Sequence, residues 1–173
     1  QELKLLGTSI NFTRSFATTE KNIHFSAFVR WQFNKLQGAS KIKFDKIIDF
    51  VKGKFNPIFK KHELEVVWEA NWDSPAENAF ASPGTTPNQR FLTIGGGLYR
   101  HPAMTSESLL FVLCHEVGHI LGGAPFNAHF HNLSAEGQAD YYATNTCLPI
   151  LLEGQNNIDF IKKLNVPLHA KLD

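Results

Sequence analysis

The sequence predicts a single α+β domain, because its 173 residues place helical patterns first, short β-prone runs next and helical patterns again at the end. This length is sufficient for one hydrophobic core and short for two domains. The composition, 43 % hydrophobic and 19 % charged, is typical of a globular chain and argues against disorder. We therefore expect one domain over residues 1–173.

Two helices are predicted in the first third of the chain. Residues 23–36 are rich in aromatic side chains, and apolar residues recur there at helical spacing. A second helix is expected to begin after Ser40, a suitable N-cap, and to break near Asn56 because Pro57 lacks a backbone N–H. Its predicted buried face carries Ile42, Ile47, Ile48, Val51, Phe55 and Phe59.

Two short strands are predicted in the middle of the chain. Residues 64–68 and 90–94 are β-prone, and the second run ends at the three glycines of residues 95–97. Prolines and glycines are frequent in residues 73–88, which predicts turns there. We expect the strands to form a small antiparallel sheet beside the helix that follows.

Helices are predicted again in the last third. Residues 106–121 form a helical pattern that ends at a glycine pair. Ser134 is expected to cap another helix, which runs to about Cys147 and stops at Pro149. A short final helix is expected over residues 158–164, where apolar residues recur at helical spacing.

The predicted helix over residues 106–121 carries the HExxH pattern, with His115, Glu116 and His119. Histidines four residues apart lie on one helix face, so both imidazoles can reach one metal ion. Zinc lowers the pKa of a bound water toward about 7, and a neighbouring carboxylate such as Glu116 can take its proton. The pattern predicts one zinc ion; a structural helix with two coincidental histidines is the alternative.

A zinc site that keeps one position for water needs a third protein ligand. The longer pattern HExxHxxGxxH is excluded, because Pro125 stands where its third histidine would be. Glu136, in the first turn of the next predicted helix, is the favoured ligand. His129 and His131, in the loop between the two helices, are rival candidates.

Asp140 follows Glu136 by one helical turn and is expected on the same face. A metal-bound histidine usually donates its second ring N–H to a carboxylate, which fixes its tautomer. Asp140 is predicted to accept this hydrogen bond, with His115 as the donor. The alternative is that both acidic residues merely favour a helix N-terminus.

Charge and hydropathy restrict the classes of partner. The formal net charge of +1 offers no basic field for nucleic acid, and the lysines between Lys41 and Lys61 are interpreted as a solvated helix face. No run approaches the roughly 18 apolar residues of a membrane helix. We therefore expect neither nucleic acid nor a membrane span, and the oligomeric state stays open.

The cysteines and the first residue bear on the compartment. Cys114 and Cys147 are compatible with one disulfide and equally with two buried thiols. The chain begins at Gln1, and a removed secretory signal would account for a first residue other than Met. We expect a soluble protein that is secreted or periplasmic.

The order of motifs resembles the gluzincin zinc metallopeptidases, and within them the HtpX and CAAX-prenyl-protease branch. That resemblance joins HExxH to a later Glu-x-x-x-Asp, which is Glu136 to Asp140 here. The other matching stretches are Asn78-Ala79-Phe80-Ala81, Leu92-Thr93-Ile94 and Gly97-Leu98-Tyr99. It covers about residues 78–143, and it departs from the branch in lacking membrane helices.

The resemblance implies a zincin-like fold and a zinc-dependent peptidase, expected to be an endopeptidase acting on peptide or protein substrates. It implies His115, His119 and Glu136 as ligands, Glu116 as general base and Asp140 as the residue that orients a ligand. The main alternative is a catalytically silent zinc domain that binds extended peptides at a strand edge.

The resemblance also implies a substrate-binding strand. Leu92, Thr93, Ile94 and Gly95 would border the cleft and pair with an extended substrate, as in β-augmentation. Asn78 would help to shape that edge.

Overall fold

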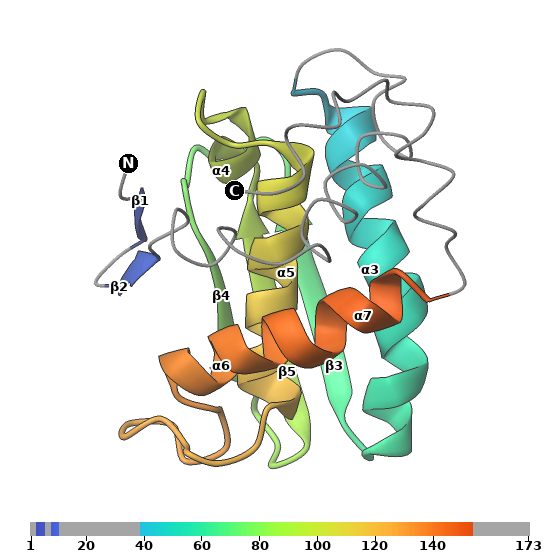
Figure 1. The fold of residues 1–173 in the computed structure, drawn as a ribbon, viewed down its shortest axis with the longest axis vertical. Helices are drawn as coiled ribbons and strands as arrows, with labels where there is room; N and C mark the ends of the chain where they lie inside the picture. The colour runs from blue at the N-terminus through green and yellow to red at the C-terminus, as the bar shows by residue number, and fades with distance from the viewer. Residues whose placement is uncertain (1–2, 6–7, 11–38, 154–173) are drawn as a thin grey trace, which may run out of the picture.

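The computed structural model describes residues 3–5, 8–10 and 39–153 of the chain (Figure 1). The first two ranges contain β1 (Leu3–Leu5) and β2 (Thr8–Ile10), which pair antiparallel. The helices predicted over residues 23–36 and 158–164 lie outside the described residues. The remaining elements form a mixed α/β arrangement with a small sheet.

Helix α3 (Lys41–Lys61) begins where the sequence predicted, because the Ser40 hydroxyl accepts the N–H of Lys43. The predicted break near Asn56 is wrong, because the helix continues through Pro57. Phe55 and Phe59 are fully buried on either side of the proline, so packing holds the last turn on the core.

The sheet has three strands: β3 (Glu65–Asn71), β4 (Ala79–Pro83) and β5 (Gln89–Gly95). The strand order is β3-β5-β4, with β3 parallel and β4 antiparallel to β5. The predicted antiparallel sheet is therefore wrong. Strand β4 fell within the predicted turns because it is short and ends in Pro83, which an edge strand tolerates.

Strand β5 lies at the centre of this sheet, and this overturns its predicted pairing with an extended substrate. Leu92, Thr93 and Ile94 each face one residue of β3 and one of β4. Gly95 pairs with β3, and its N–H donates to the carbonyl of Asn78 at 2.9 Å. The two neighbouring strands thus occupy the edges that a ligand would need.

Two helices follow the sheet: α4 (Gly96–Arg100) and α5 (Ser106–Leu121). The boundaries of α5 are those predicted, and the Thr105 hydroxyl caps it by accepting the N–H of Ser108. Helices α3 and α5 lie against one face of the sheet, and α5 contacts β4 and β5 (Figure 1). Almost the whole of α5 is buried, so it packs against other elements on more than one face.

The chain then forms one continuous helical segment that crosses α5: α6 (Glu136–Tyr142), the π-helix η1 (Ala143–Cys147) and α7 (Leu148–Leu151) (Figure 1). The predicted stop at Pro149 is wrong. The proline falls in the first turn of α7, where its missing N–H costs least, and the wider π turn precedes it. A disulfide between Cys114 and Cys147 joins α5 to the end of η1.

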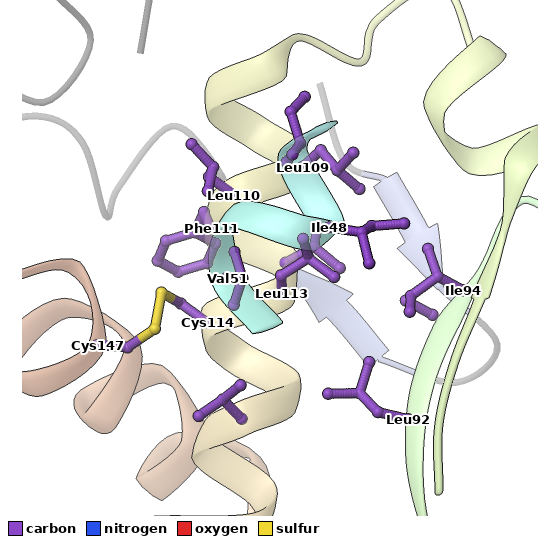
Figure 2. Close-up of a cluster of buried hydrophobic side chains, with 14 of the residues drawn as sticks. Ile48, Val51, Leu92, Ile94, Leu109, Leu110, Phe111, Leu113, Cys114 and Cys147 are labelled. Carbon is purple, nitrogen blue, oxygen red and sulfur yellow. A yellow bond between two sulfur atoms is a disulfide. The ribbon is translucent and has the colours of Figure 1, made fainter. Parts of the chain in front are cut away.

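The core lies between the sheet and helices α3 and α5. Figure 2 shows Ile48 and Val51 of α3, Leu92 and Ile94 of β5, and Leu113 of α5 converging in it. Each such side chain stabilises the fold by roughly 1.5–3 kcal/mol through burial. Within the described ranges, no helix has both the length and the apolar character to cross a membrane.

Candidate metal centre

The structure brings the three predicted ligands together. Nε2 of His115 lies 3.1 Å from Oε2 of Glu136, and Nε2 of His119 lies 3.6 Å from the same oxygen. The histidines are one turn apart on α5, and Glu136 is the first residue of α6. Among residues 39–153, this is the one group of three whose potential ligand atoms all lie within 4.8 Å of one another.

The exposure of the three side chains leaves the group open on one side. His115 and His119 are buried, with 3 % and 8 % of their surface exposed, whereas 47 % of the Glu136 side chain is exposed. Two imidazole nitrogens and one carboxylate are a donor set that suits zinc. The exposed side would leave a fourth position accessible to water.

Each histidine is oriented through its other ring nitrogen. Nδ1 of His115 lies 2.8 Å from Oδ1 of Asp140, which is the contact that the sequence predicted. Nδ1 of His119 lies 2.8 Å from the carbonyl oxygen of Ser134. Because carboxylate and carbonyl oxygens only accept, both Nδ1 atoms carry the proton, and in the neutral rings Nε2 has its lone pair free for a metal.

Sequence reasoning missed the role of Ser134, which it treated only as a helix cap. The residue makes two contacts with His119 of α5, since its carbonyl lies against Nδ1 and its N–H donates to the carbonyl of His119. Its hydroxyl also donates to the carbonyl of Gly123, just beyond the end of α5. Helix α6 instead has Ala135 at its N-cap. A main-chain carbonyl has no residue-type signature, so no sequence pattern could have identified this contact.

Glu116 is buried between α5 and β4, with 3 % of its surface exposed. Its carboxylate accepts the N–H of Ala81, while Oε2 is buried with no hydrogen-bond partner. Burial raises the pKa of Glu116, against the opposing charges of His115 and His119. A buried, unsatisfied carboxylate oxygen is costly, so it marks a place where a water or ligand proton is expected.

The metal-free group forms a strongly coupled set of ion pairs. Burial opposes the charged form of His115, but hydrogen bonds to Asp140 and Glu136 raise its pKa from 6.5 to about 10. Hydrogen bonds from His115 and His119 hold the pKa of Glu136 far below its usual value. Without a metal the acid is therefore ionised and His115 protonated at neutral pH, so a cation entering the group displaces protons.

Helices α5 and α6 approach closely because small residues meet at their contact. A Cβ added to Gly118 would lie 2.6 Å from the carbonyl oxygen of Ala139. One turn on, the amide of Gln138 donates to the carbonyl of Gly122 at 2.6 Å. This contact places the first turn of α6, and with it Glu136, beside the two histidines.

The rival ligands proposed from the sequence lie elsewhere. His129 and His131 are exposed in the loop between α5 and α6, and neither belongs to the metal-binding group. The backbone N–H of His129 donates to the side chain of Asn127, as part of a compact turn in that loop.

Comparison with known proteins relates part of the chain to cytoplasmic leucine–tRNA ligases. The chain is 56 % identical to that of Saccharomyces cerevisiae over 39 residues, which is 22 % of this chain and 4 % of the ligase. It is 50 % identical to that of Pongo abelii over 46 residues, 27 % of this chain and 4 % of the ligase. No family model and no solved structure matches the chain.

These relatives overturn the predicted family and activity. They are named as ligases of leucine and tRNA, so the prediction of a gluzincin zinc peptidase, and of a hydrolase in general, is wrong. The alternative, a silent zinc domain that binds peptides at a strand edge, is unsupported as well. Their names include "cytoplasmic", which also counts against a secreted or periplasmic location.

The extent of the match limits what the relatives imply. The chain spans about 4 % of the length of these ligases, and almost three quarters of it lies outside the match. A segment of 46 residues is smaller than an ordinary domain with its own core. The zincin-like fold and the use of the metal-binding group thus stay predictions.

Proposed function

We propose that this chain is a zinc-binding protein whose single ion is held by His115, His119 and Glu136. The observation that carries the proposal is the convergence of three ligand atoms from two helices, with each histidine fixed through its other nitrogen. Nitrogen and carboxylate ligands suit zinc rather than calcium or magnesium, which prefer oxygen.

Glu116 would act on the water at the fourth position. Its unpartnered Oε2 is available to accept a hydrogen bond there, and burial raises its pKa, which favours the uptake of a proton. Zinc, when bound, supplies the positive charge that makes such a water acidic. The proposal covers metal binding and the ionisation of a bound water, and it assigns no reaction and no substrate.

Metal binding is tested by titrating zinc into metal-free protein against a chromophoric chelator, with the metal content measured independently. We expect one zinc per chain, and loss of binding by at least 100-fold in His115→Ala and Glu136→Gln. His131→Ala, in the exposed loop, is the matched control and should bind like the unchanged protein. The proposal would be overturned if both ligand variants bound zinc with the same stoichiometry and affinity as the unchanged protein.

The role of Glu116 has a separate test. In cobalt-substituted protein, the visible spectrum reports ionisation at the fourth position as pH rises. Glu116→Gln should keep the metal but lower the apparent pKa of this change by about one unit or more, since a buried negative charge no longer opposes ionisation. An unchanged titration curve would remove Glu116 from the site's chemistry.

A second candidate function is contact with tRNA, which the leucine–tRNA ligase relatives suggest. Helix α3 supports it, because seven lysines against two aspartates give the helix a formal charge of +5. Lys54, Lys60 and Lys61 are exposed near its C-terminal end. The interpretation of these lysines as only a solvated face is therefore open to revision.

This candidate is tested by fluorescence anisotropy with labelled tRNA over a range of salt concentrations. Binding through the lysines predicts an affinity that falls steeply with salt, and a salt slope smaller by about three in Lys54→Ala/Lys60→Ala/Lys61→Ala. Absence of binding at low salt would discard the candidate and leave the metal site untouched.

A further inference from the structure

We infer that the Cys114–Cys147 disulfide positions the metal centre, so that the affinity for zinc depends on the oxidation of this cysteine pair. The inference rests on the proposed zinc binding and adds that the disulfide controls its affinity. It starts from the location of the two cysteines relative to the ligands.

Each cysteine is coupled to one side of the metal-binding group. Cys114 directly precedes His115 on α5. Cys147 ends η1, which continues without interruption from α6, the helix that begins with Glu136. The bond closes a sequence separation of 33 residues, and all three ligands lie within that interval. The disulfide therefore joins the two helices that must stay in register for the ligands to converge.

The helix that carries Glu136 packs on α5 mainly through small residues. Ala139 is its one buried residue, and Ala143 and Cys147 are the buried residues of η1. These three small residues recur every four positions and face α5, where Gly118 meets Ala139. Small side chains bury little apolar surface, so they fix the helix only weakly. The covalent bond adds a constraint to this packing.

Polar contacts hold the start of α6, and the disulfide holds the far end of the same helical segment. Asp140 and Gln138 of α6 each bond α5, at His115 and at the carbonyl of Gly122. These contacts lie in α6 near Glu136, whereas the disulfide lies about three turns beyond Glu136 along the same helical segment. Loss of the disulfide would release the far end of this helical segment, and a change in its angle across α5 would shift Glu136 relative to the histidines, where a preorganised site allows only about 0.5 Å.

The burial of the cysteine pair limits when the disulfide can be reduced or re-formed. Both cysteines are fully buried, with no exposed surface, so a reductant reaches the sulfurs only after local opening (Figure 2). A phosphine then breaks the S–S bond, two protons from water give two thiols, and the phosphine leaves as its oxide. The pair would thus set the metal affinity when the chain folds, rather than change it quickly in the folded protein.

The test compares zinc affinity in three forms of the full chain: oxidised, reduced by a phosphine during refolding, and the double variant Cys114→Ala/Cys147→Ala. We expect 10- to 100-fold weaker binding in the reduced form and in the double variant, as when ligand-orienting contacts are lost. Reoxidation of the reduced form should restore the affinity. The double variant also shows whether free thiols contribute ligands.

Two controls separate positioning from general stability. Val51→Ala removes buried volume from α3 and should lower stability while keeping zinc affinity within about twofold. Sulfate is added to all samples to favour the folded state, and circular dichroism confirms folding at each titration point. In cobalt-loaded protein, the reduced form should show an altered visible spectrum.

The outcomes distinguish this inference from the proposal beneath it. If folded reduced protein and the double variant bind zinc within twofold of the oxidised form, the disulfide does not position the site. If the oxidised protein itself binds no zinc, the proposed metal centre is wrong. If Val51→Ala weakens zinc binding as much as the double variant does, the effect comes from lower stability alone and the inference is overturned.

Discussion

The close contact between α5 and α6 gives the most detailed prediction, which concerns Gly118→Ala. Gly118 lies between Glu116 and His119 on α5 and faces α6. The added methyl group would meet backbone atoms of Ala139, with its oxygen at 2.6 Å and its Cα at 2.9 Å. Backbone cannot rotate away as a side chain can, so α6 must move outward.

The size of this movement follows from the contact distances. An ordinary contact begins at 3.4 Å, so α6 must move by about 0.8 Å to accept the methyl group. Overpacking of this kind costs about 1–3 kcal/mol, and the better helix propensity of alanine offsets about 0.5–1 kcal/mol. We expect a net loss of about 1–2 kcal/mol. Because Glu136 moves with α6, zinc affinity should fall by about tenfold or more.

The assay is zinc titration together with chemical unfolding, and Gly137→Ala is the matched control. Gly137 lies next to Glu136 on the same helix, yet a Cβ there meets nothing within 4 Å. This control should bind zinc normally and be more stable by up to about 1 kcal/mol. If Gly118→Ala binds zinc as tightly as the control, the close helix contact does not position Glu136.

Three further predictions concern the same centre. Asp140→Asn should weaken zinc binding by about 10- to 100-fold, because His115 loses its charged acceptor; equal affinity in the chelator titration would contradict this. Removal of the disulfide should lower the free energy of unfolding by roughly 3–4 kcal/mol for its 33-residue separation, measured in urea, and an unchanged midpoint would be inconsistent with it. Burial opposes the charged form of metal-free His115, but hydrogen bonds to Asp140 and Glu136 raise its pKa to about 10. Zinc binding at pH 7 should therefore release protons and become tighter as pH rises. Calorimetry in buffers of different ionisation enthalpy measures that release, and a value of zero would refute it.

Local patterns in the sequence predicted local structure well. Helix α5 has the predicted bounds because its cap, its apolar run and its closing glycines all lie within one segment. The errors arose where distant residues decide. Strand β4 depends on pairing with β5, and the parallel pairing of β3 with β5 cannot be read from either strand alone. The helix breaks predicted at Pro57 and Pro149 do not occur, because the packing and helix geometry around these residues outweigh the local preference of proline.

The metal-binding group was predictable for a related reason. His115 and His119 are neighbours on any helix, and the reversal of the chain after α5 made Glu136 a plausible third ligand. The carbonyl of Ser134 and the central position of β5 were not predictable, since both depend on the tertiary fold. The inferred family failed because a short motif specifies chemistry at a site and does not specify ancestry.

The most direct test of the account is an anomalous diffraction measurement at the zinc edge, on crystals of the zinc-loaded protein. We expect one peak about 2.0–2.2 Å from Nε2 of His115, Nε2 of His119 and a carboxylate oxygen of Glu136. A peak held instead by the loop histidines His129 and His131, or no peak near α5, would contradict the proposed centre.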